Sequence, residues 1–183
     1  VRELRNIGIQ PDILLCRSRR PLTKEMRDKL SLFCDVSPEA VIEGLDTDSV
    51  YELPLIFEEQ GFGGLVADRL GIDGKPDHSE WEQVVSRVRK PTHKVTVAMV
   101  GKYMALQDSY ISVTEAIKHG GIANDAEVEV RRVDSEEIEK HGPEKLLEGV
   151  SGVVVPGGYG DRGVEGKIQA IRHCRENKVP FLG

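Results

Sequence analysis

A glycine-rich segment near the end of the chain is the feature that most directly suggests chemistry. The string VVVPGGYGDRGVEGK, residues 153–167, runs from an apolar stretch into a loop that holds Gly157, Gly158, Gly160 and Gly163. Loops at the carboxyl ends of parallel strands are where such sheets bind ligands. Glycine lets the backbone approach a small substrate, and backbone N–H groups could face an oxyanion that develops during acyl transfer. The alternative is a tight turn without a functional role.

The same loop lacks GxGxxG and GxxxxGK[ST], so it is neither a dinucleotide fingerprint nor a Walker P-loop. Three cysteines, Cys16, Cys34 and Cys174, form no CxxC pair, which argues against a zinc site and a secreted disulfide framework and favours a reducing compartment. The five histidines show no metal spacing: His78, His93, His119, His141 and His173. No metal site is predicted within the chain.

The composition sets broad limits on function. The 183 residues are 39% hydrophobic and 31% charged, which is typical of one large domain or two small ones with a real core. A net charge of −6 argues against binding along a nucleic-acid backbone. No apolar run is long enough to span a bilayer, and no signal peptide opens the chain. Val1 opens within a helical pattern and the last residues form a strand pattern, so we expect an internal piece of a longer protein.

The first part of the chain predicts alternating strands and helices. The expected elements are a strand at 12–17, a helix from the N-cap Thr23 through Cys34, a strand at 41–45, a helix from Pro54 to about Gln60, and a helical segment at 65–70. A shift to Gly, Asp, Lys and Pro after residue 70 predicts a linker at 71–93, which includes a helix around Trp81.

The second part has the regular alternation of an α/β sheet protein. Strands are predicted at 94–100, 126–133, 151–155 and 179–182. Helices are predicted at 109–119, where Gly120 and Gly121 should end the helix, at 143–148 and at 164–177. This order predicts a doubly wound parallel sheet. The most apolar runs, 95–100 and 152–155, suit strands covered on both faces.

Four strings, in this order, carry a resemblance to a known family. They are IGIQPDILLCRSRRPL at 7–22, EMRDKLSLFCDV at 25–36, GKYMALQDSYISVTEAIKHGG at 101–121, and PGGYGDRGVEGKI at 156–168. Together they resemble the CTP synthase family across essentially the whole chain. The resemblance implies the C-terminal part of a P-loop-type synthetase (amidoligase) domain at 1–70, an interdomain linker at 71–93, and the N-terminal part of a flavodoxin-like class I glutamine amidotransferase domain at 94–183.

The resemblance also implies an activity. Members of this family are cytoplasmic ligases, tetrameric in form, that aminate UTP to CTP with ATP, Mg²⁺ and ammonia released from L-glutamine. GTP activates them and CTP inhibits them. ATP and Mg²⁺ would be bound mainly by residues outside this chain. The nucleophilic cysteine would follow two residues after Gly183, so no catalytic residue is expected here and the isolated piece should be inactive.

Site residues follow from the resemblance position by position. Gly157 and Gly158 match the glutamine-binding and oxyanion region, with turn geometry as the alternative. Tyr159 and Arg162 match a possible GTP-sensitive gate. Their alternatives are an exposed aromatic side chain and a surface pair between Asp161 and Arg162.

Nucleotide contacts are implied in the first part of the chain. Lys29 matches a lysine that contacts UTP and CTP; the sequence alone would make it a solvated helix lysine. Leu45, Asp46 and Thr47 match a segment that cradles the ATP adenine through its backbone, although relatives often carry lysine at position 45. By pattern alone, these three residues are a strand end and a turn.

Other charged residues and the cysteines are assigned more broadly. Arg17, Arg19 and Arg20 form a basic cluster for which structural or subunit contact, or contact with a phosphate, are the alternatives. Cys174 lies within a helix pattern and is not expected to be the nucleophile, while Cys16 and Cys34 should pack as small hydrophobic residues.

Two other functions stay open at this point. The first is a different class I glutamine amidotransferase, such as the glutaminase half of a GMP synthetase, against which the segment at 7–18 argues. The second is a non-catalytic flavodoxin-like binding module.

Overall fold

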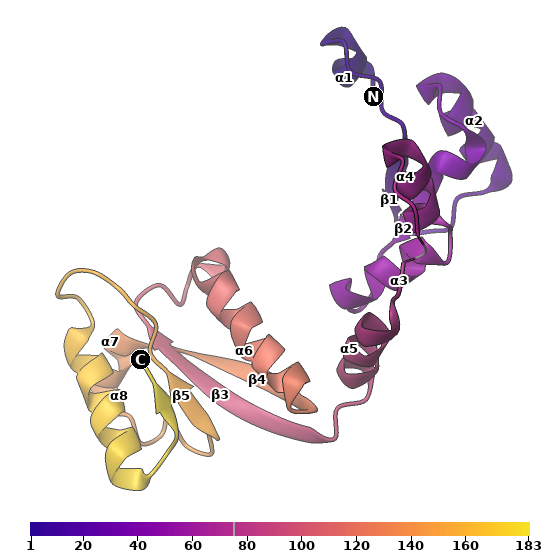
Figure 1. Cartoon of the computed structure of the whole chain (residues 1–183). Helices are drawn as coiled ribbons and strands as arrows, with labels where there is room; N and C mark the ends of the chain where they lie inside the picture. Colours follow the sequence, from indigo (N-terminus) through magenta and orange to yellow (C-terminus); the bar gives the residue numbers. More distant parts are fainter. Residues whose placement is uncertain (75) are drawn as a thin grey trace. The chain divides into compact units, whose positions relative to one another are not determined.

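The computed structural model describes residues 1–74 and 76–183, so Lys75, within the predicted linker, lies outside the described residues. The chain forms two compact units, Val1–Ser86 and Arg87–Gly183, which are described separately (Figure 1). The division between them falls within helix α5 (Ser79–Arg89), the helix expected around Trp81.

The first unit is built on two parallel strands, β1 (Leu14–Ser18) and β2 (Val41–Leu45), paired from Leu14 opposite Val41 to Ser18 opposite Leu45. The helices are α1 (Arg2–Asn6), α2 (Lys24–Cys34), α3 (Leu53–Glu58) and α4 (Phe62–Leu70), with single 3₁₀ turns at Pro38–Ala40 and Val50–Glu52. The predicted N-cap is present, because the Thr23 hydroxyl accepts a hydrogen bond from the Met26 N–H at 3.2 Å.

The core of this unit is small. Ala40, Val41, Ile42 and Val85 are buried. The helical repeat of α2 predicted an apolar face of Met26, Leu30 and Phe33, but Met26 is 53% and Phe33 74% exposed, and only Leu30 is half-buried. The predicted helix is therefore confirmed, while most of its apolar face lies open to solvent.

The second unit is a parallel sheet of four strands in the order β4-β3-β5-β6. The strands are β3 (His93–Gly101), β4 (Ala126–Asp134), β5 (Gly152–Val154) and β6 (Phe181–Leu182). The chain passes from β3 outward to β4 and then returns to the other side of β3 to form β5. The carboxyl ends of β3 and β5 therefore lie side by side at a topological switch point, which is the position where open α/β sheets bind ligands.

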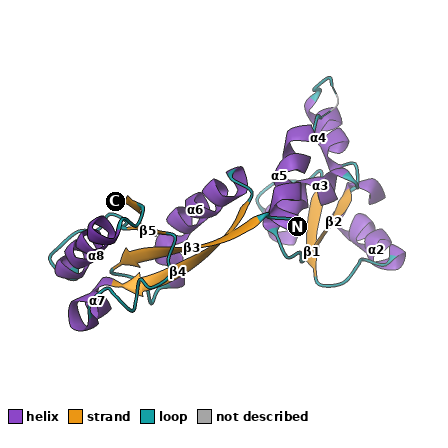
Figure 2. Ribbon diagram, turned by 90° about the horizontal axis from the view of Figure 1, so that it is seen from below, coloured by secondary structure: helices purple, strands orange, loops and turns teal. Residues whose placement is uncertain are grey.

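Helices cover both faces of this sheet (Figures 1 and 2). Helix α6 (Ile111–Ala123), which follows a 3₁₀ turn at Gln107–Tyr110, covers one face, and α7 (Ser135–His141) and α8 (Val164–Asn177) pack together on the other. Ala98 and Val100 of β3 belong to the buried cluster on the α7 and α8 side, while Met99 between them points the opposite way and is also buried. The predicted doubly wound parallel sheet is confirmed.

The predicted end of the helix at Gly120 and Gly121 is wrong, because α6 continues to Ala123. Gly121 is buried where α6 approaches β4. A Cβ atom there would lie 2.4 Å from Val128 Cγ2 and 2.7 Å from the carbonyl oxygen of Ala126. Glycine at this position thus permits close helix–strand packing and does not end the helix.

The predicted helix at 143–148 is also wrong. These residues form turns, closed by a hydrogen bond from the Leu147 N–H to the Pro143 carbonyl, and the helix before β5 is α7. Asp134 caps α7 by accepting the Glu136 N–H at 2.8 Å, and Gly142, with φ of 79°, ends it. One fully buried apolar residue, Ile138, anchors this helix, so it has no apolar repeat that the sequence could reveal.

No helix in the described part of the chain is both long and apolar enough to cross a membrane.

Candidate functional site

The glycine-rich loop connects β5 to α8 at the switch point of the sheet. Gly157 and Gly158 are exposed. Within residues 1–74 and 76–183, no group accepts a hydrogen bond from the N–H of Gly157 or of Gly158. The loop thus presents two adjacent backbone donors whose hydrogen bonds are left to solvent or a ligand.

The fold requires glycine at some positions of the loop and not at others. Positive φ angles occur at Gly160 (77°) and Gly163 (69°), and not at Gly157 or Gly158. A Cβ atom on Gly157 would meet nothing within 4 Å, whereas one on Gly158 would lie 3.3 Å from Lys167 Nζ and 3.8 Å from Lys102 Cε. Backbone conformation therefore explains Gly160 and Gly163, while nothing in the fold requires glycine at position 157.

Close packing holds the end of the loop against the start of α7. A Cβ atom on Gly163 would lie 2.2 Å from Ser135 Oγ, and one on Gly166 only 1.8 Å from the Ser135 carbonyl oxygen. Ser135 is fully buried, and the Gly166 N–H donates to Glu139 Oε1 at 3.2 Å. Because Gly163 and Gly166 have no side chain, the first turn of α8 packs directly against α7, and this contact fixes the point where the loop ends.

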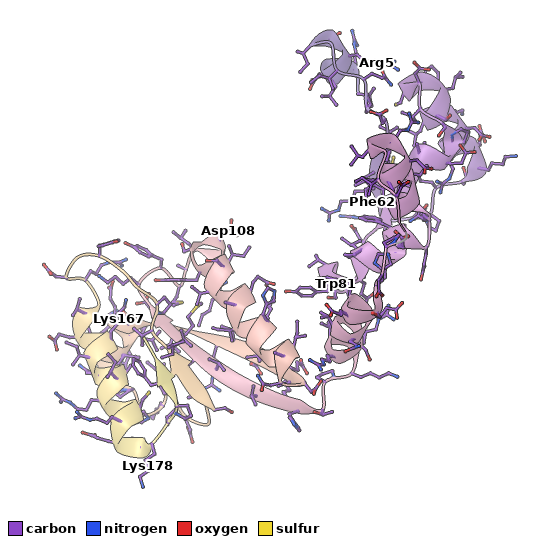
Figure 3. All side chains as sticks on the ribbon, in the orientation of Figure 1. Arg5, Phe62, Trp81, Asp108, Lys167 and Lys178 are labelled. Carbon is purple, nitrogen blue, oxygen red and sulfur yellow. The ribbon has the colours of Figure 1, made fainter. Side chains whose placement is uncertain are left out.

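Two lysines that the sequence did not single out lie on the inner side of the loop. Lys102, directly after β3, is only 3% exposed, and its Nζ donates to the carbonyl oxygens of Tyr159, at 2.8 Å, and of Gly160. Lys167 Nζ, near the start of α8 (Figure 3), donates to the carbonyl oxygen of Pro156 at 2.9 Å. Partial burial, together with the charge of Lys102, lowers the pKa of Lys167.

Arg162 ties the far end of the loop to the same strand end. Its guanidinium forms an ion pair with Glu136 Oε1 at 2.6 Å, donates to the Lys102 carbonyl at 3.1 Å, and stacks 5.4 Å from the centre of the Tyr103 ring. Arg162 therefore pairs with Glu136 and not with its neighbour Asp161. Tyr159 is 98% exposed, so its side chain projects into solvent at the tip of the loop.

A pocket of about 390 Å³ in the first unit brings together all three residues predicted for the adenine. Leu45, Asp46 and Thr47 line it at the end of β2. The rest of the lining is mainly apolar and consists of Leu15, Arg17, Gly44, Val50, Leu53 and Phe57. Its size and apolar walls suit a flat heteroaromatic ring.

The basic cluster at the end of β1 contacts this pocket through Arg17. Arg17 Nε donates to Asp46 Oδ1 at 3.0 Å, and Arg19 Nε lies 3.9 Å from Asp46 Oδ2, so the Asp46 carboxylate faces two arginines. The third arginine, Arg20, contributes its backbone carbonyl, which accepts a hydrogen bond from the Ser18 hydroxyl.

Lys29 does not line this pocket. It is exposed on α2 and pairs with Glu25 at 2.9 Å in an i,i+4 arrangement.

All three cysteines are free thiols. Cys174 is buried in the core of the second unit, and this burial raises its pKa. Burial and the neighbouring Cys34 raise the pKa of Cys16. A raised pKa disfavours the reactive thiolate, so Cys16 and Cys174 have the environment of packing residues and not of nucleophiles.

We expect Cys174 to resist iodoacetamide until the protein unfolds, because its thiol is buried and protonated. Replacing Cys174 with alanine should cost about 1 kcal/mol in the free energy of unfolding, because a small cavity remains in the core. Mass spectrometry of labelled peptides across a urea series measures both the reactivity and the stability. Labelling of Cys174 at a rate equal to that of the half-buried Cys34 in native buffer would contradict this assignment.

Among the described residues, no three His, Cys, Asp or Glu side chains gather in a way that could hold a metal ion.

Comparisons with known proteins match both parts of the chain. A family model described as "CTP synthase N-terminus" matches residues 1–72, and one described as "Glutamine amidotransferase class-I" matches residues 105–183. CTP synthases of Ruminiclostridium cellulolyticum and Carboxydothermus hydrogenoformans are each 52% identical over the whole chain. The chain belongs to the CTP synthase family. It spans 34% of the length of these curated relatives.

A solved structure of a Trypanosoma brucei CTPS glutaminase domain with bound acivicin is also similar to part of the chain. It has 41% sequence identity and a TM-score of 0.43, and the match covers 48% of this chain and 34% of that one. The family assignment rests on the sequence matches, which extend over both units.

Proposed function

We propose that this chain is part of an enzyme that aminates UTP to CTP, using ATP and ammonia released from L-glutamine. One observation carries the proposal. A single chain matches a CTP synthase N-terminus and a class I glutamine amidotransferase in that order, and it is 52% identical to CTP synthases along its whole length. The predicted parts at 1–70, 71–93 and 94–183 would be the end of the synthetase domain, the linker, and the start of the amidotransferase domain.

The glycine-rich loop would serve glutamine hydrolysis. In this reaction a cysteine attacks the side-chain amide, and the amide oxygen becomes an oxyanion before ammonia leaves and a thioester remains. The free N–H groups of Gly157 and Gly158 are suitable donors for that oxygen. The open space beside Gly157 supports a substrate role, because a side chain at that position would occupy the space through which a ligand reaches the backbone.

The pocket at the end of β2 would hold the adenine of ATP. The apolar lining would contact the faces of the base, and the backbone of Leu45–Thr47 would contact its polar edge. Since Arg17 engages the Asp46 carboxylate, a backbone role for Asp46 is more consistent with its contacts than a side-chain role. Mg²⁺ would be bound mainly by residues outside this chain.

The remaining assignments depend on the family alone. Lys29 would contact UTP or the inhibitor CTP, and Tyr159 and Arg162 would form part of a GTP-sensitive gate. The enzyme would act in the cytoplasm as a homotetramer. Light scattering after size-exclusion chromatography of the full-length protein tests the tetramer.

The activity is tested with the full-length protein that contains this chain. We expect CTP to form from UTP and ATP with either glutamine or ammonium as the nitrogen source, and glutamate to appear only with glutamine. A different class I amidotransferase would release glutamate without forming CTP. A non-catalytic binding module would produce neither glutamate nor CTP.

A further inference from the structure

We propose that Lys102 and Lys167 are positioning residues for glutamine hydrolysis, and that they aim the backbone N–H groups of the glycine-rich loop by binding its carbonyl oxygens from the inner side. This inference rests on the proposed function. It adds two residues that contact neither the substrate nor the reacting atoms and that act through the loop.

The contact of Lys167 determines the direction of a specific donor. Its Nζ binds the carbonyl oxygen of Pro156, which belongs to the same peptide unit as the Gly157 N–H. The peptide unit is planar and trans, so its C=O and N–H point in opposite directions. Holding the Pro156 oxygen inward therefore turns the Gly157 N–H outward, where no described group accepts a hydrogen bond from it.

Lys102 restrains the loop further along, where the carbonyls that it binds share peptide units with the N–H groups of Gly160 and Asp161. Its buried ammonium binds two consecutive carbonyls, those of Tyr159 and Gly160, which are 57 and 58 positions away along the chain. These contacts are possible because β3, which ends beside Lys102, lies next to β5, from which the loop starts. Three carbonyls of the segment 156–160 are thus held by two ammonium groups.

The ammonium groups of Lys102 and Lys167 also have an electrostatic effect on the loop, in addition to their packing. Neither lysine forms an ion pair with a carboxylate in the described part of the chain. Burial, and to a smaller extent the charge of Lys102, lowers the pKa of Lys167. Two unneutralised positive charges behind a loop add to the field that stabilises a negative charge on its outer side. An uncharged pair of side chains could fill the same space without this effect.

The test uses Lys102→Met and Lys167→Met in the full-length protein. Methionine keeps an unbranched apolar stem and removes the ammonium. Lys140→Met is the matched control, because Lys140 is an exposed lysine of the same unit that pairs with Glu137 on its own helix. CTP formation is measured with glutamine and with ammonium for each variant, and kcat and KM for glutamine are determined separately.

We expect kcat with glutamine to fall about 10- to 100-fold in both variants, because a misdirected oxyanion donor loses most of its effect. Lys167 sets the direction of the Gly157 donor itself, and Lys102 restrains the loop that carries it. CTP formation from ammonium should stay within about twofold of wild type, since it does not use the loop. Lys167→Arg should recover part of the glutamine-dependent kcat, because a guanidinium also donates to the Pro156 carbonyl. Lys140→Met should behave as wild type in both assays.

The proposal is overturned if both methionine variants keep the glutamine-dependent kcat, or if glutamine- and ammonium-dependent rates fall together, which would indicate a general structural role. Should Lys102→Met fail to fold, the half-buried Lys167 still supplies the test. A wild-type protein that forms no CTP from either nitrogen source would instead refute the proposed function.

Discussion

Gly166→Ala is expected to destabilise the second unit by about 3 kcal/mol, near the upper end of the cost of overpacking a core. The added methyl group would lie 1.8 Å from the backbone carbonyl oxygen of Ser135, and a backbone atom cannot rotate away as a side chain can. Relief requires α8 to move away from α7, which would also weaken the hydrogen bond from the Gly166 N–H to Glu139. Thermal unfolding followed by circular dichroism measures the effect.

Gly120→Ala is the matched control for this change. Gly120 also lies inside a helix, α6, but a Cβ atom there meets nothing within 4 Å. Alanine at that position should raise the stability by about 1 kcal/mol, because it lowers the backbone entropy of the unfolded chain. Equal melting temperatures for the two variants would contradict the close contact between α7 and α8.

Gly157→Ala is expected to leave the stability nearly unchanged and to lower glutamine-dependent CTP formation about 100-fold, which is the scale of losing one oxyanion donor. The fold tolerates the methyl group, because φ at Gly157 is not positive and the Cβ position is open. A glutamine amide that must approach this backbone would meet the methyl group. Parallel assays with glutamine and with ammonium in the full-length protein separate the two effects.

The ammonium-dependent rate of Gly157→Ala serves as its internal control and should match wild type, as should both rates of Gly120→Ala. If Gly157→Ala hydrolyses glutamine at the wild-type rate, the loop would be a turn with no contact to the substrate.

Most helices and strands could be predicted, because the apolar runs and helix limits that define them are set by residues close together in the sequence. The apolar run of β3 and the strand β2 at Val41–Leu45 were recognisable without tertiary information, and α8 begins and ends where its pattern predicted. The missed features depend on distant contacts. Gly121 reads as a helix end unless the neighbouring strand β4 is known, and α7 has one buried apolar residue, so neither could be inferred from periodicity.

In the candidate site, too, features set by the local sequence could be predicted and features set by distant contacts could not. The glycine-rich string located the loop, and the three residues predicted for the adenine line one pocket. The role of Lys102 could not be predicted, because its contacts with the loop exist only once β3 and β5 are adjacent. The signal was nevertheless present, since Lys102 and Lys167 each lie within a string that resembles the family.

The contacts of Arg162 and Lys102 have a consequence for how the loop would meet a ligand. The side chain of Lys102 holds the loop, and Arg162 of the loop in turn holds the backbone of Lys102, so each segment restrains the other. The conformational entropy of the loop is then lost when the protein folds and not when a ligand arrives. Affinity at this position would depend less on an ordering penalty and more on the direct contacts themselves.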